Sequence, residues 1–264
     1  MSGHAREEWL ADERRGRIRE LLALQGKVRA QHLVQLFGVS EDTIRRDLTD
    51  MAEQGLLRRV HGGALPLTAA SVGGSWQERV GRDAAEKQAL VAAVLRELRG
   101  GERIFLDSGT TNALLARQLP RALPFTVVTT SPEAALALCD HERCDVIVPG
   151  GRLHRRTASF CGAEAVRMVE AMYADVCLLG VCAVSADGGL TCEEFDEMAV
   201  KQAMLRRAER RLALVSTGKL GARLPWQVAD VGVITRLFTT ADETEPALQA
   251  IGRLGVPVSC VEMG

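Results

Sequence analysis

Residues 40–48 read Ser40-Glu41-Asp42-Thr43-Ile44-Arg45-Arg46-Asp47-Leu48. Ser40 is a favourable N-cap, and the two acidic residues after it suit the positive end of a helix dipole. Ile44, Leu48 and Met51 recur at the spacing of one helical face. The pattern therefore predicts a helix that begins at Ser40 and buries one apolar stripe.

The other side chains of this helix, and the turn before it, predict a helix-turn-helix. Thr43, Arg45 and Arg46 fall outside the apolar stripe and are expected to face outward. Residues 33–37 mark a short preceding helix, and Gly38 stands where a tight turn needs a positive φ. In a helix-turn-helix of this kind the second helix enters the DNA major groove.

The following segment has the pattern of a basic β-hairpin. Residues 55–64 start with a glycine that ends the helix, continue as a basic strand and turn on Gly62-Gly63. Such a hairpin can lie along phosphates or in a minor groove. A three-helix scaffold with solvated arginines is the alternative, but the agreement of cap, turn, stripe and hairpin favours DNA binding. The predicted DNA-binding residues are Ser40, Asp42, Thr43, Arg45, Arg46, Arg58, Arg59 and His61.

The composition is that of a globular protein with a small module and one larger domain. The 264 residues are 47% hydrophobic and 25% charged, with a net charge of −1, so DNA affinity must come from a local patch. Seven cysteines without a Cys-x-x-Cys pair predict buried, reduced thiols, with no metal site and no cofactor. The N-terminus is charged, unlike a signal peptide, and no apolar run reaches the length of a membrane span. We therefore predict a cytoplasmic protein that does not bind membranes.

Beyond the hairpin the pattern changes to an α/β domain. We predict a winged helix-turn-helix domain at 1–66, a linker at 67–83 and an α/β domain at 84–264. Short apolar strands alternate with helices there, which indicates a mostly parallel sheet covered on both faces. The predicted strands are 103–106, 125–129, 145–148, 176–179, 212–215, 231–234 and 258–261.

One glycine- and hydroxyl-rich turn of this domain could bind a phosphate. Asp107-Ser108-Gly109-Thr110-Thr111 follows the strand 103–106 and opens a helix, whose backbone N–H groups could hold an anion. The turn is neither a Walker loop nor a dinucleotide fingerprint, and a plain helix cap is the alternative. Ligands of open α/β sheets bind at the carboxyl ends of strands. The predicted effector-binding residues at these ends are Asp107, Ser108, Gly109, Thr110, Thr111, Thr130, Gly150, Gly151, Gly180 and Lys219.

These stretches resemble one family along almost the whole chain. The segments 39–48 and 61–64 are similar to the N-terminal signature of DeoR-type bacterial transcriptional regulators, and 106–111, 189–191 and Lys219 resemble their effector domain, which is related to ribose-5-phosphate isomerases. The resemblance implies a repressor of carbohydrate-metabolism genes that a phosphorylated sugar or sugar alcohol releases from double-stranded operator DNA. Two departures occur: Thr130 replaces the usual Asn, and Ser216-Thr217-Gly218-Lys219 replaces Asp-Ser-Ser-Lys.

Alternative functions use the same parts. An activator or dual regulator would have the same sequence features, and a protein-interaction module could use the winged domain. An isomerase would need a carboxylate after the strand 176–179, where the chain reads Gly180-Val181-Cys182-Ala183. Glu197 and Lys201 are expected to form an exposed helical pair, so no enzymatic activity is predicted. One winged module contacts little DNA, which favours a homodimer or homotetramer.

Overall fold

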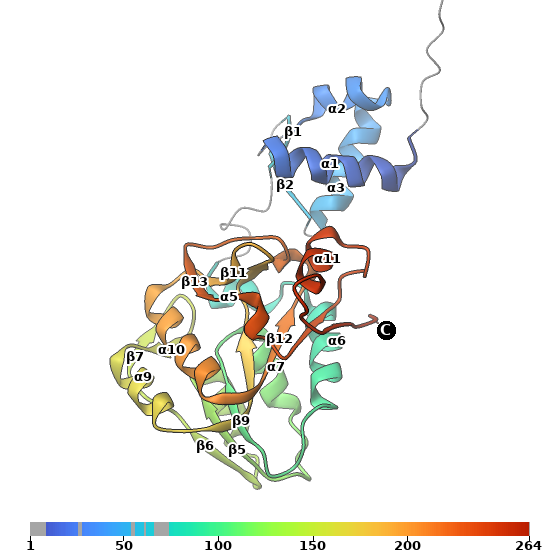
Figure 1. Cartoon of the computed structure of the whole chain (residues 1–264). Coiled ribbons are helices and arrows are strands. Elements are labelled where there is room, and N and C mark those ends of the chain that lie inside the picture. Colours follow the sequence, from blue (N-terminus) through green and yellow to red (C-terminus); the bar gives the residue numbers. More distant parts are fainter. Residues whose placement is uncertain (1–8, 26–27, 54–55, 61, 66–73, 264) are drawn as a thin grey trace, which may run out of the picture. The chain divides into compact units, whose positions relative to one another are not determined.

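The computed structural model describes residues 9–25, 28–53, 56–60, 62–65 and 74–263 (Figure 1). Contacts within the chain divide it between Ser71 and Val72 into two units, each described by itself. In the described part, no helix is both long enough and apolar enough to cross a membrane.

The N-terminal unit is a winged helix. Its core buries Ile44, Leu48 and Met51, the predicted stripe, against side chains of the other two helices. Gly38 has a φ of 67°, as the predicted turn requires. Gly63 is needed for strand pairing, because a Cβ there would lie 2.1 Å from the Val28 carbonyl oxygen. The elements are α1 (Ala11–Gln25), β1 (Val28–Arg29), α2 (Ala30–Phe37), α3 (Glu41–Glu53), β2 (Arg58–Val60) and β3 (Gly63–Leu65), with antiparallel strands in the order β1-β3-β2.

A parallel seven-stranded sheet forms the centre of the second unit. The first of these strands in the chain lies third from one edge, the next two add on one side of it, and the last four add on the other side. The strand order across the sheet is β6 (Cys144–Ile147), β5 (Phe125–Thr129), β4 (Arg103–Leu106), β9 (Ala174–Gly180), β12 (Ala208–Val215), β14 (Arg236–Thr239) and β15 (Val258–Cys260).

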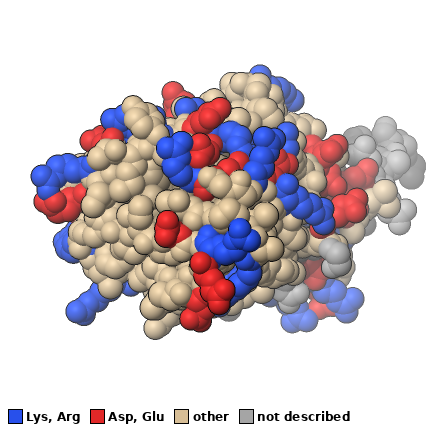
Figure 2. Space-filling model, turned by 90° about the horizontal axis from the view of Figure 1, so that it is seen from below, with Lys and Arg blue, Asp and Glu red and all other residues tan. Residues whose placement is uncertain are grey.

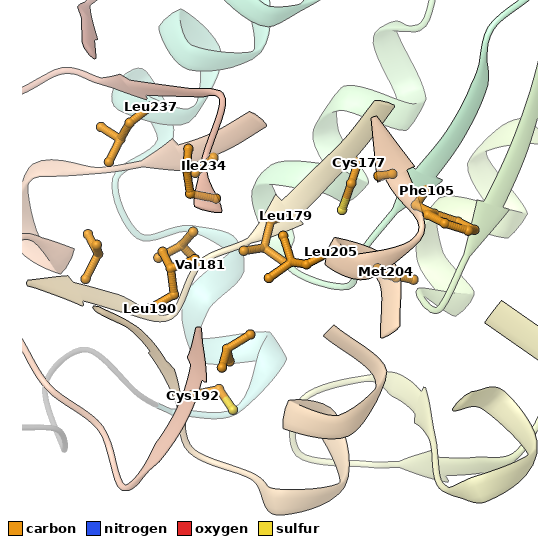
Figure 3. Close-up of a cluster of buried hydrophobic side chains, with 14 of the residues drawn as sticks. Phe105, Cys177, Leu179, Val181, Leu190, Cys192, Met204, Leu205, Ile234 and Leu237 are labelled. Carbon is orange, nitrogen blue, oxygen red and sulfur yellow. The ribbon is translucent and has the colours of Figure 1, made fainter. Parts of the chain in front are cut away.

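Helices cover both faces of this sheet (Figure 1), which confirms the predicted architecture. Alternate residues of the buried strands enter different cores: Phe105 joins one, and its neighbour Leu106 the other. Figure 3 shows part of the first core, including Leu179 of β9 and Leu205 of α10. On that face lie α9 (Ala163–Glu170), α10 (Phe195–Arg206) and α11 (Pro246–Gly252), and on the other α6 (Ala84–Leu95), α7 (Thr110–Gln118) and α8 (Pro132–Leu138).

Smaller elements flank the sheet. An antiparallel sheet contains β10 (Ala183–Ser185), β11 (Gly189–Cys192) and β13 (Trp226–Ala229), and a hairpin contains β7 (Arg152–His154) and β8 (Ser159–Cys161). Within the segment predicted as a linker, α5 (Trp76–Val80) packs on the second unit, where the backbone N–H of Trp76 donates to the Arg156 carbonyl at 2.7 Å.

One predicted strand is wrong. Residues 231–234 form a short 3-10 helix, η2 (Val231–Val233), and the strand follows it as β14. Val231 and Ile234 lie three residues apart, and both are buried. A single helical turn buries two such residues as well as a strand does.

Candidate functional site

The start of α3 carries the predicted recognition surface. The Thr43 backbone N–H donates to Ser40 Oγ at 3.1 Å, and the hydroxyls of Ser40 and Thr43 lie 2.8 Å apart. Ser40 is therefore the N-cap of α3, as predicted, and its hydroxyl oxygen accepts a backbone N–H of the first helical turn.

Asp42 orders the two arginines of this helix. Its carboxylate accepts from Arg45 at 2.7 Å and pairs with Arg46 at 3.3 Å. The arginine side chains are 68% and 80% exposed. Asp42 thus orients Arg45 and Arg46 through ion pairs, and the two arginines present the positive charge of the helix to solvent.

The wing meets α3 through Arg59. Its guanidinium donates to Thr49 Oγ1 at 2.8 Å, and that hydroxyl donates to the Arg45 carbonyl. Arg58 has its backbone in β2, whereas His61 lies outside the described residues. On the face drawn in Figure 2, Lys and Arg side chains alternate with Asp and Glu side chains, in keeping with a net charge of −1.

Asp47 has a role that the sequence pattern did not reveal. It is 3% exposed and accepts from Arg14 at 2.9 Å and from Arg15 at 3.3 Å. The partners lie more than thirty residues away on α1, so only the folded unit shows that Asp47 fixes α1 against the recognition helix.

The order of the strands in the large sheet places a topological switch point between β4 and β9. These neighbours are connected to later strands on opposite sides of the sheet, and such a switch point is where open α/β sheets bind ligands. Asp107 follows β4, and its Oδ2 accepts the N–H of Gly180, the last residue of β9, at 2.9 Å. Thr130, after β5, donates to the other Asp107 oxygen at 3.4 Å. Three of the predicted effector residues therefore meet at this point.

Glu197 and Lys201 correct the sequence interpretation. They are 5% and 3% exposed, so the predicted exposed pair is wrong. Lys201 instead pairs with Asp107 and donates to the Gly180 carbonyl at 2.9 Å. Burial alone would lower the pKa of Lys201, but Asp107, Cys182 and Glu197 together raise it, so the ammonium stays charged.

Glu197 is held by hydroxyl groups beside this pair. Ser159 donates to it at 2.6 Å. Burial alone would raise the pKa of Glu197, yet the charge of Lys201 and the Ser159 hydrogen bond lower it. The carboxylate is thus kept ionised as part of a buried polar network that sequence spacing did not predict.

The predicted phosphate cradle surrounds the start of α7. Gly109 is the N-cap, with a φ of 123°, and no side chain caps the helix. Ser108 packs its carbonyl so close to Gly180 that a Cβ on Gly180 would lie 2.1 Å from it. Thr110 and Thr111 are partly exposed in the first turn. The first N–H groups of α7 are thus left without a side-chain acceptor, which suits an anion.

Lys219 lies in the short helix η1 (Thr217–Lys219) after β12. Its turn is anchored by Glu86 of α6, whose Oε2 accepts the Thr217 N–H at 2.8 Å. Chiefly burial lowers the pKa of Lys219 to about 8, and the nearby charges of Arg79 and Lys87 act in the same direction. Burial raises the pKa of the Cys182 thiol, and the charges of Lys201 and Lys219 both act to lower it, so the two lysines lie near the same side chain.

The two glycines after β6 have a backbone role. Gly150 and Gly151 have φ values of 71° and 94°, and a Cβ on Gly151 would lie 2.6 Å from the Cys161 carbonyl oxygen. They allow the backbone to pack closely against β8 where the chain enters the β7–β8 hairpin. No hydrogen bond among the described residues links these glycines to Asp107 or Lys219.

Three further features bear on ligand binding. Asn112 of α7 donates to the carbonyls of Asp107 and Leu178, at 3.0 and 2.9 Å, and so fixes the start of α7 against β4 and β9. Among the described residues, no group of three or more His, Cys, Asp or Glu side chains could hold a metal ion.

A separate open cavity of about 390 Å³ is lined by Gln202, Leu205, Arg206, Arg211, Val228, Ala229 and Val233, none of which was predicted.

Comparisons with known proteins match both units. Residues 14–69 match the DeoR-like helix-turn-helix domain, and residues 82–241 match the DeoR C terminal sensor domain. The HTH-type transcriptional regulator GlpR of Haloferax volcanii is 31% identical over 249 residues, covering 94% of this chain and 97% of that protein. The glycerol-3-phosphate regulon repressor of Escherichia coli K12 is 29% identical over 239 residues, covering 90% and 94%. The ribose 5-phosphate isomerase A structure from Methanocaldococcus jannaschii aligns with a TM-score of 0.37 and 17% identity, over 53% of each chain.

Proposed function

The chain belongs to the DeoR family of transcriptional regulators, and we propose that it represses carbohydrate-metabolism genes until a phosphorylated sugar or sugar alcohol binds. The observation that carries the proposal is the pairing of two sites in one chain. The first is the exposed pair Arg45 and Arg46 on the recognition helix. The second is the group of polar residues that meets at the ends of β4 and β9.

The chemistry of the groups at these strand ends supports the proposed effector class. A phosphate would accept the uncapped N–H groups at the start of α7 and pair with Lys219, gains that a neutral hydroxyl lacks. Asp107 and Thr130 would stand beside the sugar hydroxyls. One relative is named for the glycerol-3-phosphate regulon, which makes glycerol 3-phosphate a natural first compound to test.

The DNA-binding form is proposed to be a homodimer or homotetramer. A single recognition helix reads a few base pairs, and two-fold dimers read paired half-sites about one helical turn apart. Sedimentation of the protein bound to operator DNA tests this directly. A strictly monomeric complex of high specificity would contradict it.

Isomerase activity is the second function to consider, because the buried acids Asp107 and Glu197 do lie near the strand ends. Proton transfer between adjacent carbons needs a carboxylate that can take up a proton. Burial raises the pKa of Asp107, but both of its oxygens are engaged, Oδ2 by Lys201 and the Gly180 N–H and Oδ1 by Thr130. The lowered pKa of Glu197 makes that carboxylate a weak base. We therefore propose a regulator without this activity, and incubation with ribose 5-phosphate should give no ketose.

The proposed function is tested on the protein–operator complex. Operator DNA is first selected from a random pool, and the complex is then titrated with glycerol 3-phosphate and a panel of sugar phosphates, each beside its unphosphorylated parent. At least one phosphorylated compound should release the DNA, and its parent should not. Release by a parent sugar alone would place the effector chemistry elsewhere.

A further inference from the structure

Three cations gather around η1 without carboxylate partners. Arg79, Lys87 and Lys219 make no ion pair within 4 Å among the residues that the structure describes. The charges of Arg79 and Lys87 both lower the pKa of Lys219. The charge of Asp83 acts in the opposite direction on the pKa of both lysines. Positive charge that is partly buried and incompletely compensated is costly unless an anion accompanies it.

Arg79 stands on α5, the first described helix after residues 66–73. Its Nε–H donates to the Gly74 carbonyl at 3.2 Å, and a second N–H donates to the Thr157 carbonyl at 3.4 Å. These carbonyls carry no charge, and no described carboxylate oxygen lies within 4 Å of the guanidinium. Arg79 also acts electrostatically on Cys182 and Glu197, which places it beside the network of Lys201.

Adjacent residues of α6 join α5 to the turn of Lys219. Lys87, only 7% exposed, donates to the carbonyls of Arg79 and Val80, at 2.5 and 3.3 Å, and so holds the end of α5. Glu86 accepts from Thr217 and from Thr240 and so holds η1. A displacement of η1 would therefore reach α5 through one rigid helical turn.

We propose that Arg79 of α5 binds the anionic group of the effector together with Lys219. Effector binding is then sensed by the same segment that leads to the DNA-binding unit. The inference rests on the proposed function, and it adds a residue outside the strand ends and a route for the signal. Lys87 is a positioning residue in this arrangement, because both of its hydrogen bonds go to the α5 backbone.

The charge of Arg79 is the variable to test. Arg79→Gln removes the charge and keeps a hydrogen-bonding side chain, and Arg79→Lys restores the charge. Arg117→Gln is the matched control, since Arg117 is exposed in the last turn of α7. The readouts are operator affinity without effector, the concentration of the releasing sugar phosphate that frees half of the DNA, and competition by inorganic phosphate.

Arg79→Gln should raise the half-releasing concentration about tenfold or more, because a hydrogen bond to a charged group is lost. Operator affinity should stay within about twofold, Arg79→Lys should recover most of the response, and Arg117→Gln should behave as wild type. Release by Arg79→Gln at the wild-type concentration overturns the inference while leaving the proposed function intact. A wild-type protein that ignores every sugar phosphate overturns both.

Trp76 offers a second readout that does not depend on a variant at the site. It lies on α5, and in a Trp9→Phe, Trp226→Phe background it is the remaining tryptophan. Its emission should change with the releasing sugar phosphate and with inorganic phosphate at higher concentration. An unchanged spectrum under conditions that release the DNA contradicts the proposed place of the anion beside α5.

Discussion

Arg14 of α1 donates its Nε–H to Asp47 of α3 at 2.9 Å, and both side chains are nearly buried, at 11% and 4% exposed. Removing one partner of such a pair leaves a buried charge uncompensated, at a cost of about 3–5 kcal/mol. Asp47→Ala should therefore destabilise the DNA-binding unit by that order and weaken operator binding. Urea unfolding measures it, with Asp50→Ala as the control, since Asp50 is 47% exposed and its pair with Arg15 is worth about 1 kcal/mol or less.

The recognition helix and the wing should contribute differently to DNA binding. Arg45→Ala or Arg46→Ala is expected to lose about 1–3 kcal/mol on the preferred operator and to relax base preference, because Arg grips guanine bidentately in the major groove. Arg59→Ala should weaken all sequences alike and reduce the salt dependence, as expected of a phosphate contact. Binding-site selection at two salt concentrations distinguishes them. Identical selected sequences and identical salt slopes for the three variants would contradict the division.

Local patterns predicted the elements that depend on local interactions. The cap at Ser40, the positive φ of Gly38 and the buried stripe of α3 are all set within a few residues of chain. The strands β4 and β5 were predicted at their observed bounds, because short apolar runs after turns fit a sheet buried on both faces.

Contacts between distant elements were not predictable in this way. The spacing of Glu197 and Lys201 fits an exposed helical pair, yet the partner of Lys201 is Asp107, 94 residues earlier in the chain. Helical spacing tells which residues share a face and not whether that face meets solvent or the end of a sheet. Arg79 was missed for the same reason, since its neighbourhood is assembled from α5, α6 and η1.

The buried pair of Lys201 and Asp107 predicts a non-additive effect on stability. Lys201→Met leaves Asp107 buried without its cation and should cost about 3–5 kcal/mol. Adding Asp107→Asn keeps an acceptor for the Gly180 N–H and removes the unpaired charge, so the double variant should be more stable than Lys201→Met alone. Urea unfolding of the four proteins gives the coupling. Strictly additive losses would show that the pair is not an interacting unit.

Effector binding should depend on pH through Lys219. Burial lowers the pKa of Lys219 to about 8, so the free protein loses this positive charge as the pH rises through 8. A phosphate group is a dianion above a pKa of about 6, and it binds best while Lys219 is protonated. Affinity for the releasing sugar phosphate should therefore fall between pH 7 and 9.5. Calorimetry measures this fall, and Lys219→Arg, which stays charged throughout that range, should flatten it.

The last prediction separates effector binding from DNA binding. Lys219→Ala removes a charge from the proposed phosphate site, which lies in the second unit, and changes no residue of the winged helix. Operator affinity should stay intact while release is abolished, so the variant represses permanently.

Gly109→Val should act in the same way by a different physical route. A φ of 123° strains any β-branched residue, so the start of α7 must shift and its N–H groups lose their common direction. By linkage, operator DNA must weaken effector binding to the wild type by the same factor by which effector weakens DNA binding, typically about 5–150-fold. Titrating the releasing sugar phosphate against each protein, with and without operator, measures both sides of that equality. Undiminished release from Gly109→Val would mean that the phosphate does not bind at the start of α7.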